Sequence, residues 1–295
     1  MTAEGGPIEK DDVQVAAVPE ASPPADAKPF LKWVGGKRQL LTEIARHVPA
    51  SFGRYHEPFI GGGALFFHLR QSRACPAFLT DSNRRLIRAY RGVQHDAEGV
   101  IALLQEHERK HSKPYFHKVR EQRDIDSATA TEVAAWMIYL NRTGYNGLYR
   151  VNSSNIFNVP FGKYANPRIC DEENLRACSR ALSGAELEAV GFESVLDRAR
   201  PGDFVYFDPP YRPVTTTANF TDYTSEGFGD VDQVRLRDVA WALKKRGVAV
   251  VLSNSNSPFI EEIYRDGFDR VKVGARRSVN SDPKGRGLVQ ELILK

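Results

Sequence analysis

The tetrapeptide Asp208-Pro209-Pro210-Tyr211 combines residue types that suit a flat base with an exocyclic amino group. It follows the apolar run 203–207, which is typical of a buried strand after a Pro-Gly turn. Because two prolines stop that strand, it ends on a carboxylate, where open α/β sheets bind ligands. The carboxylate and one backbone carbonyl would accept two N–H bonds, and the aromatic ring would stack. A stiff strand-ending turn is the alternative interpretation.

A glycine turn at Gly61-Gly62-Gly63 is the second candidate, since it follows the extended run 55–60 and precedes the helical run 64–70. Such a turn brings main-chain N–H groups and a helix N-terminus to a ligand. The dinucleotide pattern is incomplete, because Phe66 replaces its third glycine. The expected acid is present as Asp81, placed to accept hydrogen bonds from a ribose. We therefore expect a nucleoside-bearing cofactor other than NAD, with a tight turn and helix cap as the alternative.

The segment Trp33-Val34-Gly35-Gly36-Lys37 looks like a phosphate loop but lacks its first glycine and its final Ser or Thr. Its two glycines still allow backbone to approach a ligand closely. Trp33 suits either stacking on a flat ring or packing in the core.

Residues 141–169 hold four basic residues, no acid, and many Asn, Gly and aromatic residues. Arg and Lys suit phosphates and guanine edges, whereas Asn and Tyr suit bases and unstacked gaps. Loops of this length without a function are uncommon. The stretch therefore predicts a nucleic-acid contact, and a solvated surface loop is the alternative.

Strands and helices alternate on both sides of a helical middle, which predicts a doubly wound α/β fold with a helical insertion at about 90–180. A Thr-rich loop at 213–222 is long enough to close over a site. The other expected helices cover 84–94, 100–110, 132–140, 171–183, 194–199 and 232–245, and the other expected strands cover 77–80, 186–190, 248–252 and 288–294.

Composition indicates a globular protein, with 41% hydrophobic and 26% charged residues in 295. Residues 1–29 hold six acids and two bases and are expected to form a disordered tail, which leaves a net charge of +8 on the remainder. That excess suits a polyanionic partner. The sequence has no membrane-spanning run and no signal pattern, and its three cysteines lack metal-ligand spacing, so we expect a cytoplasmic protein with reduced thiols.

Taken in order, these motifs resemble the Dam family of DNA adenine-N6 methyltransferases, in the α-type arrangement of the D12 class. The resemblance covers residues 30–295 and also includes the motif Phe157-Asn158-Val159-Pro160-Phe161-Gly162. It implies a Rossmann-like catalytic domain at 30–90 and 181–295, and a helical target-recognition domain at 91–180. It further implies double-stranded DNA as substrate, GATC as target, a flipped-out adenine, a monomeric enzyme and no metal.

The resemblance implies S-adenosylmethionine as methyl donor, and roles for individual positions. The catalytic residues would be Asp208, Pro209, Pro210 and Tyr211. The cofactor would contact Trp33, Lys37, Glu57, Pro58, Phe59, Gly61, Gly63, Asp81 and Asp208. The DNA would contact Lys32, Arg142, Tyr145, Asn146, Leu148, Arg150, Pro160 and Lys163.

Two positions depart from the family pattern: Lys163 replaces a usual Arg, and Ser255 replaces the His of a usual Ser-Asn-His. Lys163 puts one backbone contact in question, since Lys and Arg are not interchangeable. Two other classes stay open. One is an amino-methyltransferase acting on RNA or on cytosine N4, and the other is a catalytically silent DNA-binding protein. A role in restriction–modification or a solitary regulatory role both fit the sequence.

Overall fold

The computed structural model describes residues 26–33, 35, 37, 40–212, 228–276 and 288–295. The expected tail up to residue 25 and the loop at 213–222 lie outside the described residues. The predicted end of the tail at residue 29 is too late. Ala27 is buried, and the backbone of Lys28 exchanges two hydrogen bonds of 2.9 Å with the side chain of Asn174. Composition alone missed this attachment, because a single distant amide provides it.

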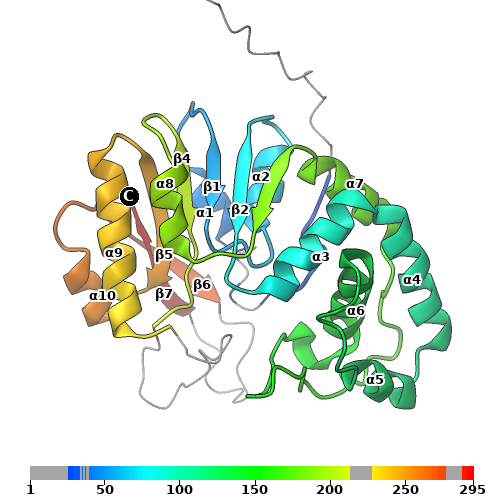
Figure 1. The fold of residues 1–295 in the computed structure, drawn as a ribbon. Coiled ribbons are helices and arrows are strands. Elements are labelled where there is room, and N and C mark those ends of the chain that lie inside the picture. Colours follow the sequence, from blue (N-terminus) through cyan, green and yellow to red (C-terminus); the bar gives the residue numbers. More distant parts are fainter. Residues whose placement is uncertain (1–25, 34, 36, 38–39, 213–227, 277–287) are drawn as a thin grey trace, which may run out of the picture.

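A sheet of seven strands forms the centre of the molecule, in the order β3-β2-β1-β4-β5-β7-β6 (Figure 1). All neighbours pair in parallel except β7, which runs antiparallel to both β5 and β6. The chain order reverses between β1 and β4, which is where open sheets of this kind bind ligands. The strands are β1 (Tyr55–Glu57), β2 (Ala77–Thr80), β3 (Ala185–Glu188), β4 (Phe204–Phe207), β5 (Ala249–Ser255), β6 (Arg270–Arg276) and β7 (Leu288–Leu294).

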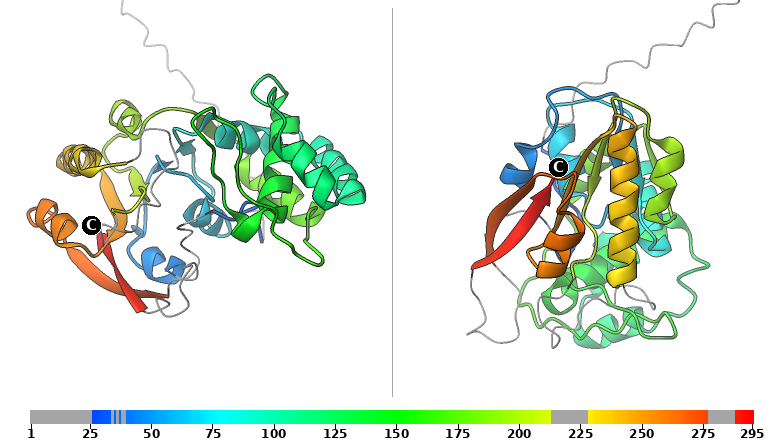
Figure 2. Two further views of the ribbon diagram at one scale, coloured as in Figure 1. Left: turned by 90° about the horizontal axis from the view of Figure 1, so that it is seen from below. Right: turned by 90° about the vertical axis from the view of Figure 1, so that its left-hand side faces the viewer.

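Strand β4 shows how both faces of the sheet are covered. Phe204 and Tyr206 belong to one apolar cluster, whereas Val205 and Phe207 belong to another on the opposite face. The first cluster includes residues of α1 (Leu41–Ala45) and α2 (Ala64–Arg70), and the second includes residues of α8 (Val195–Arg198), α9 (Asp230–Lys245) and α10 (Pro258–Ile263). Figure 2 shows these helices on either side of the sheet. The predicted doubly wound α/β fold is confirmed, since a strand buried on both faces needs such cover.

The segment between β2 and β3 adds no strand to the sheet and is mainly helical, as predicted. Its helices lie together beside the β3 edge (Figure 1). Local signals set their starts: Asn83 caps α3, and Thr129 with Glu132 forms a capping box at α6. The helices are α3 (Arg84–His95), α4 (Ala97–Lys110), α5 (Lys113–Arg120), α6 (Ala130–Thr143) and α7 (Glu172–Leu182).

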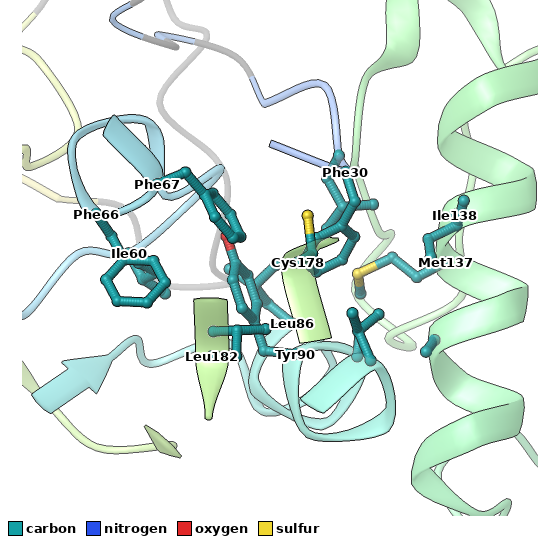
Figure 3. Packing of buried hydrophobic residues seen from close by; sticks show 14 of the residues in the cluster. Phe30, Ile60, Phe66, Phe67, Leu86, Tyr90, Met137, Ile138, Cys178 and Leu182 are labelled. Carbon is teal, nitrogen blue, oxygen red and sulfur yellow. The ribbon is translucent and has the colours of Figure 1, made fainter. Parts of the chain in front are cut away.

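The insertion shares its core with the central sheet. Figure 3 shows Phe67 and Tyr90 packed near Phe30, Cys178 and Met137, all within one cluster that also contains Phe204 of the sheet. Tyr149, Phe157 and Val159 of the loop after α6 belong to the same cluster, so apolar packing joins this loop to the sheet. The division into domains at 91–180 stays a prediction.

In the described part of the chain, no helix is both long and apolar enough to cross a membrane. The same residues contain no group of three His, Cys, Asp or Glu side chains arranged to hold a metal ion. All three cysteines are free thiols.

Candidate active site

Asp208 lies at the carboxyl end of β4, where the sequence placed it. Its Oδ1 accepts an ion pair from Lys37 Nζ at 2.7 Å and a hydrogen bond from Ser253 Oγ at 2.9 Å. Ser253 also contacts the hydroxyl of Tyr206 at 3.0 Å. Burial raises the pKa of Asp208, and Lys37 and Ser253 only partly oppose that rise. Within the described residues both contacts fall on Oδ1, so Oδ2 has capacity to accept a ligand's N–H.

Lys37 connects the first glycine segment to the tetrapeptide. Its ammonium donates to the carbonyl of Gly35 at 2.6 Å and lies 4.3 Å from the centre of the Tyr211 ring. Tyr211 in turn donates its hydroxyl to Glu291 Oε2 at 2.6 Å. The sequence predicted Lys37 and Tyr211 separately, and the structure brings both to Asp208. Glu291 was missed, because only the antiparallel insertion of β7 beside β5 carries it there.

The glycine turn after β1 is hydrogen-bonded to Asp81. The N–H of Gly61 donates to Asp81 Oδ2 at 3.3 Å, and its carbonyl accepts from the hydroxyl of Tyr90 at 3.0 Å. Asp81 Oδ1 accepts from the backbone N–H of Asn83 at 2.9 Å. Burial raises the pKa of Asp81 to about 6, although the two backbone N–H donors act to lower it. The turn and the acid of the predicted ribose site therefore form one unit.

Trp33 packs against the same turn. A Cβ atom at Gly61 would lie 2.8 Å from Trp33 Cδ1, so only glycine permits this approach, and its φ of +44° also favours glycine. The indole stacks on Tyr149 with 5.7 Å between ring centres and an angle of 22°. Trp33 is half-buried. It therefore packs against the turn and keeps some accessible ring surface, and stacking on a ligand ring stays a prediction.

The other predicted cofactor residues differ in what their side chains do. Glu57 is buried and accepts the hydroxyl of Tyr55 at 2.8 Å; burial raises its pKa well above the usual range, and the charge of Asp208 adds to that rise. Pro58 is buried. The ring of Phe59 packs against those of Phe192, Phe207 and Phe228 in the second apolar cluster. Phe59 is half-buried there, so most of its ring serves packing.

Lys32 lies beside the insertion although it precedes β1 in the chain. The Asn141 side chain accepts from the Lys32 N–H at 2.8 Å and donates to its carbonyl at 2.8 Å. The same amide donates to the carbonyl of Gly147 at 2.7 Å. One buried side chain at the end of α6 therefore joins the N-terminal segment to the 3₁₀ turn η2 (Tyr145–Gly147).

The predicted DNA contacts after α6 are mostly exposed and supported by local hydrogen bonds. The Tyr145 side chain is 51% exposed, and its N–H donates to the carbonyl of Pro160 at 2.8 Å. Arg150 donates Nε–H to Asn158 Oδ1 at 2.8 Å while its side chain faces solvent. Leu148 is half-buried, and Pro160, Asn146 and Lys163 are exposed, the last two with positive φ. These side chains share one accessible loop.

Arg142 occupies a different setting, since it is half-buried and donates NH2 to the carbonyl of Phe30 at 3.0 Å. It lines a cavity of about 910 Å³ with Lys32, Trp33 and Arg168. Burial lowers the pKa of Lys32, and the charge of Arg142 lowers it further. The lining of this cavity also includes the acids Asp26, Asp171 and Glu173, and Asp208 is not part of it.

The mostly parallel sheet has an antiparallel β7 next to β5, an acid after β2 and the Asp-Pro-Pro-Tyr tetrapeptide after β4, in line with the amino-methyltransferase class that the motif order resembles. The family model of D12 class N6 adenine-specific DNA methyltransferases matches residues 33–279, and the chain belongs to this family.

Curated relatives agree with that assignment. The Type II methyltransferase M1.LlaDCHI of Lactococcus lactis is 46% identical over 272 residues, covering 90% of this chain and 94% of the relative. The Type II methyltransferase M.MjaIII of Methanocaldococcus jannaschii is 39% identical, covering 91% and 99%. The DNA adenine methylase of Haemophilus influenzae is 35% identical, covering 90% and 92%. The enzyme class expected from the sequence is confirmed, whereas the role of each site residue stays a prediction.

Methyltransferases of this family and fold use S-adenosylmethionine in general, and the residues present fit that group. Its ribose needs hydrogen-bond acceptors, and Asp81 retains lone pairs besides those used by Gly61 and Asn83. Its sulfonium is cationic, and burial raises the pKa of both Glu57 and Asp208. A nearby positive charge would relieve that cost.

Proposed function

We propose that this protein transfers a methyl group from S-adenosylmethionine to N6 of an adenine that has turned out of duplex DNA, within the sequence GATC. The observation that carries the proposal is the geometry of Asp208. Its carboxylate ends β4, is held on Oδ1 by Lys37 and Ser253, and has Tyr211 three residues further on.

The chemistry follows from what an adenine amino group needs. Its lone pair is conjugated with the ring, so it is a poor nucleophile. Acceptors at Asp208 Oδ2 and at the Pro209 carbonyl would hold both N–H groups and direct the lone pair away from the ring plane. Bound S-adenosylmethionine supplies an electrophilic methyl group. Positioning and local charge then lower the barrier, without a covalent enzyme intermediate.

The base must leave the duplex before it can reach Asp208. Tyr145 is suited to fill the resulting gap, because its ring is exposed while its backbone is held to Pro160. Tyr211 is suited to stack on the extruded base, since its hydroxyl is anchored by Glu291. Stacking on such rings is worth about 1–3 kcal/mol per base.

Sequence choice is assigned to the exposed loop after α6. Arg150 presents donors to solvent from a guanidinium steadied by Asn158, and two such donors match guanine O6 and N7. Leu148 and Pro160 offer apolar surface for a thymine methyl group. Arg142 and Lys32 line the neighbouring cavity and suit backbone phosphates. Lys163 is exposed on the same loop and is assigned to a phosphate as well.

The test measures methylation of GATC duplexes and of duplexes with each position singly altered, with modification-sensitive sequencing of the product. Arg150→Ala is expected to relax the choice at one guanine by about 1–3 kcal/mol. Arg142→Ala, the matched arginine variant, is expected to weaken every sequence alike and to reduce the salt dependence. An equal loss on all sequences in Arg150→Ala would make Arg150 a backbone contact. Methylation of cytosine, or of RNA in preference to DNA, would overturn the proposed function.

A further inference from the structure

Gln233 is a fully buried amide in the first turns of α9, close to the catalytic tetrapeptide. Its Nε2 donates a hydrogen bond of 3.0 Å to the carbonyl of Pro210. A buried polar side chain requires hydrogen-bond partners, and the Gln233 amide finds one in the tetrapeptide. Prolines have no N–H, so Pro209 and Pro210 cannot be held by donating to a neighbouring strand. The tetrapeptide therefore depends on donors from elsewhere.

Asn254 orients the Gln233 amide. Its Nδ2 donates to Gln233 Oε1 at 2.9 Å, and its own Oδ1 accepts from the N–H of Ser255 at 2.8 Å. Asn254, like Gln233, has no exposed surface. A continuous series of hydrogen bonds thus runs from the end of β5 through α9 to the Pro210 carbonyl. With its Oε1 engaged by an N–H donor, the Gln233 amide has its NH2 directed at the tetrapeptide.

The neighbouring residue of β5, Ser253, holds the other side of the tetrapeptide by donating to Asp208 Oδ1. Two adjacent residues of one strand thus fix the groups on either side of Pro209, Ser253 directly and Asn254 through Gln233. The Pro209 carbonyl lies between these two anchored points. Its direction is set by the peptide units that they restrain.

Resting on the proposed function, we propose that Gln233 and Asn254 are positioning residues for methyl transfer, and that they aim the Pro209 carbonyl at the amino group of the target base. They touch neither substrate nor cofactor in this scheme. A misplacement of about 1 Å in a reacting group can cost about 100-fold in rate. Loss of the Gln233 bond should therefore affect the chemical step rather than binding.

The chain offers a matched control in Gln94. Its Nε2 also donates to backbone carbonyls, those of Leu182 at 2.7 Å and Ala185 at 2.8 Å, which lie at the end of α7 and the start of β3. Gln94→Leu removes the same kind of hydrogen bond at a distance from Asp208. It separates a loss of stability from a loss of positioning.

The experiment compares Gln233→Leu, Gln94→Leu and the parent enzyme in single-turnover methylation of duplex DNA. Gln233→Leu is expected to lower the methyl-transfer rate constant about 10- to 100-fold. Its affinity for S-adenosylmethionine, and the fluorescence rise of a duplex with 2-aminopurine at the target position, should stay within about twofold of the parent. That analogue carries its amino group at C2, so its extrusion does not need the Pro209 carbonyl. Gln94→Leu should transfer methyl groups at the parent rate.

Gln233→Glu is the second variant, and it remains informative if Gln233→Leu does not fold. A protonated Glu can still donate to the Pro210 carbonyl, whereas an ionised Glu repels it. Burial raises the pKa of such a carboxyl. The rate relative to the parent should therefore rise as the pH is lowered from about 10 to about 6.

Three results would overturn the inference. The first is a methyl-transfer rate constant in Gln233→Leu equal to that of the parent, and the second is an equal loss of rate in Gln233→Leu and Gln94→Leu. The third is a rate of Gln233→Glu, relative to the parent, that does not change with pH. Failure of the proposed function looks different, because the parent enzyme itself would then methylate no adenine in duplex DNA.

Discussion

Strand β4 has an aspartate at each end, and the two carboxylates have opposite environments. Asp203 precedes the strand and accepts from Arg54, from His56 Nε2 at 3.2 Å and from the backbone N–H of Arg200 at 2.8 Å. Burial opposes ionisation of Asp203, but these donors outweigh it, so its pKa is lowered. Asp208 follows the strand, and there burial outweighs its two donors and raises the pKa.

The difference separates a structural carboxylate from one prepared for a ligand. Asp203 uses both oxygens on the protein: Oδ1 accepts from the Arg54 N–H, and Oδ2 from Arg54, His56 and Arg200. Asp208 is engaged on Oδ1 alone within the described residues. Unsatisfied capacity on a buried carboxylate costs stability. Of the two aspartates, only Asp208 has such capacity, and it lies at the carboxyl edge of the sheet, where open α/β sheets bind ligands.

The largest expected effect is on activity at the carboxyl end. Asp208→Asn retains the volume of the side chain but loses the charge and one acceptor, and should reduce methyl transfer at least about 1000-fold. Relief of the burial cost of ionised Asp208 is offset by loss of the carboxylate that pairs with the buried Lys37 ammonium, so the free energy of unfolding should change less than in Asp203→Asn. Single-turnover assays and urea unfolding measure the two quantities. Turnover within about tenfold of the parent would contradict the role of Asp208.

Asp203→Asn should show the reverse pattern. Loss of its charge leaves Arg54 and His56 without their carboxylate, and we expect the free energy of unfolding to fall by about 3 kcal/mol. The lowered pKa of Asp203 makes its contribution present above its unfolded pKa and lost as the pH falls through the lower folded value. The folded variant should keep its turnover number. If turnover falls as far as in Asp208→Asn, the two ends of β4 are not functionally distinct.

Asp81 is an intermediate case, since two backbone N–H groups bind it while burial raises its pKa to about 6. The ionised form is the better acceptor for a ribose. Affinity for S-adenosylmethionine should therefore weaken as the pH falls through about 6. Asp81→Asn should bind about 10- to 100-fold more weakly, because a charge-assisted hydrogen bond is worth about 1.5–3 kcal/mol.

Calorimetry over that pH range provides the check on Asp81. The Asn variant should show little pH dependence, since it has no carboxyl group to titrate. Parent-like affinity in Asp81→Asn would contradict the ribose assignment, and Asp81 would then belong with Asp203 as a structural acid.

Much of the candidate site could be predicted from local patterns. The apolar run before Asp208 and the two prolines after it define a strand end whatever the rest of the chain does. The glycine turn at 61–63 and Asp81 after the next short strand are likewise local, and the structure joins them by a hydrogen bond. The helical character of the middle was also predictable, because capping residues and apolar spacing act within one helix.

The tertiary structure decided which residues complete these motifs. Ser253 reaches Asp208 because β5 pairs with β4, and Glu291 reaches Tyr211 because β7 turns antiparallel beside β5. Gln233 meets the Pro210 carbonyl only because α9 packs on β5. Strand order depends on the packing of helices from distant parts of the chain, so neither hydrophobic periodicity nor composition predicts it. The sequence alone therefore determines the chemical groups at the strand ends. The fold selects their partners, because a hydrogen bond needs its two atoms about 3 Å apart and these partners come from distant parts of the chain.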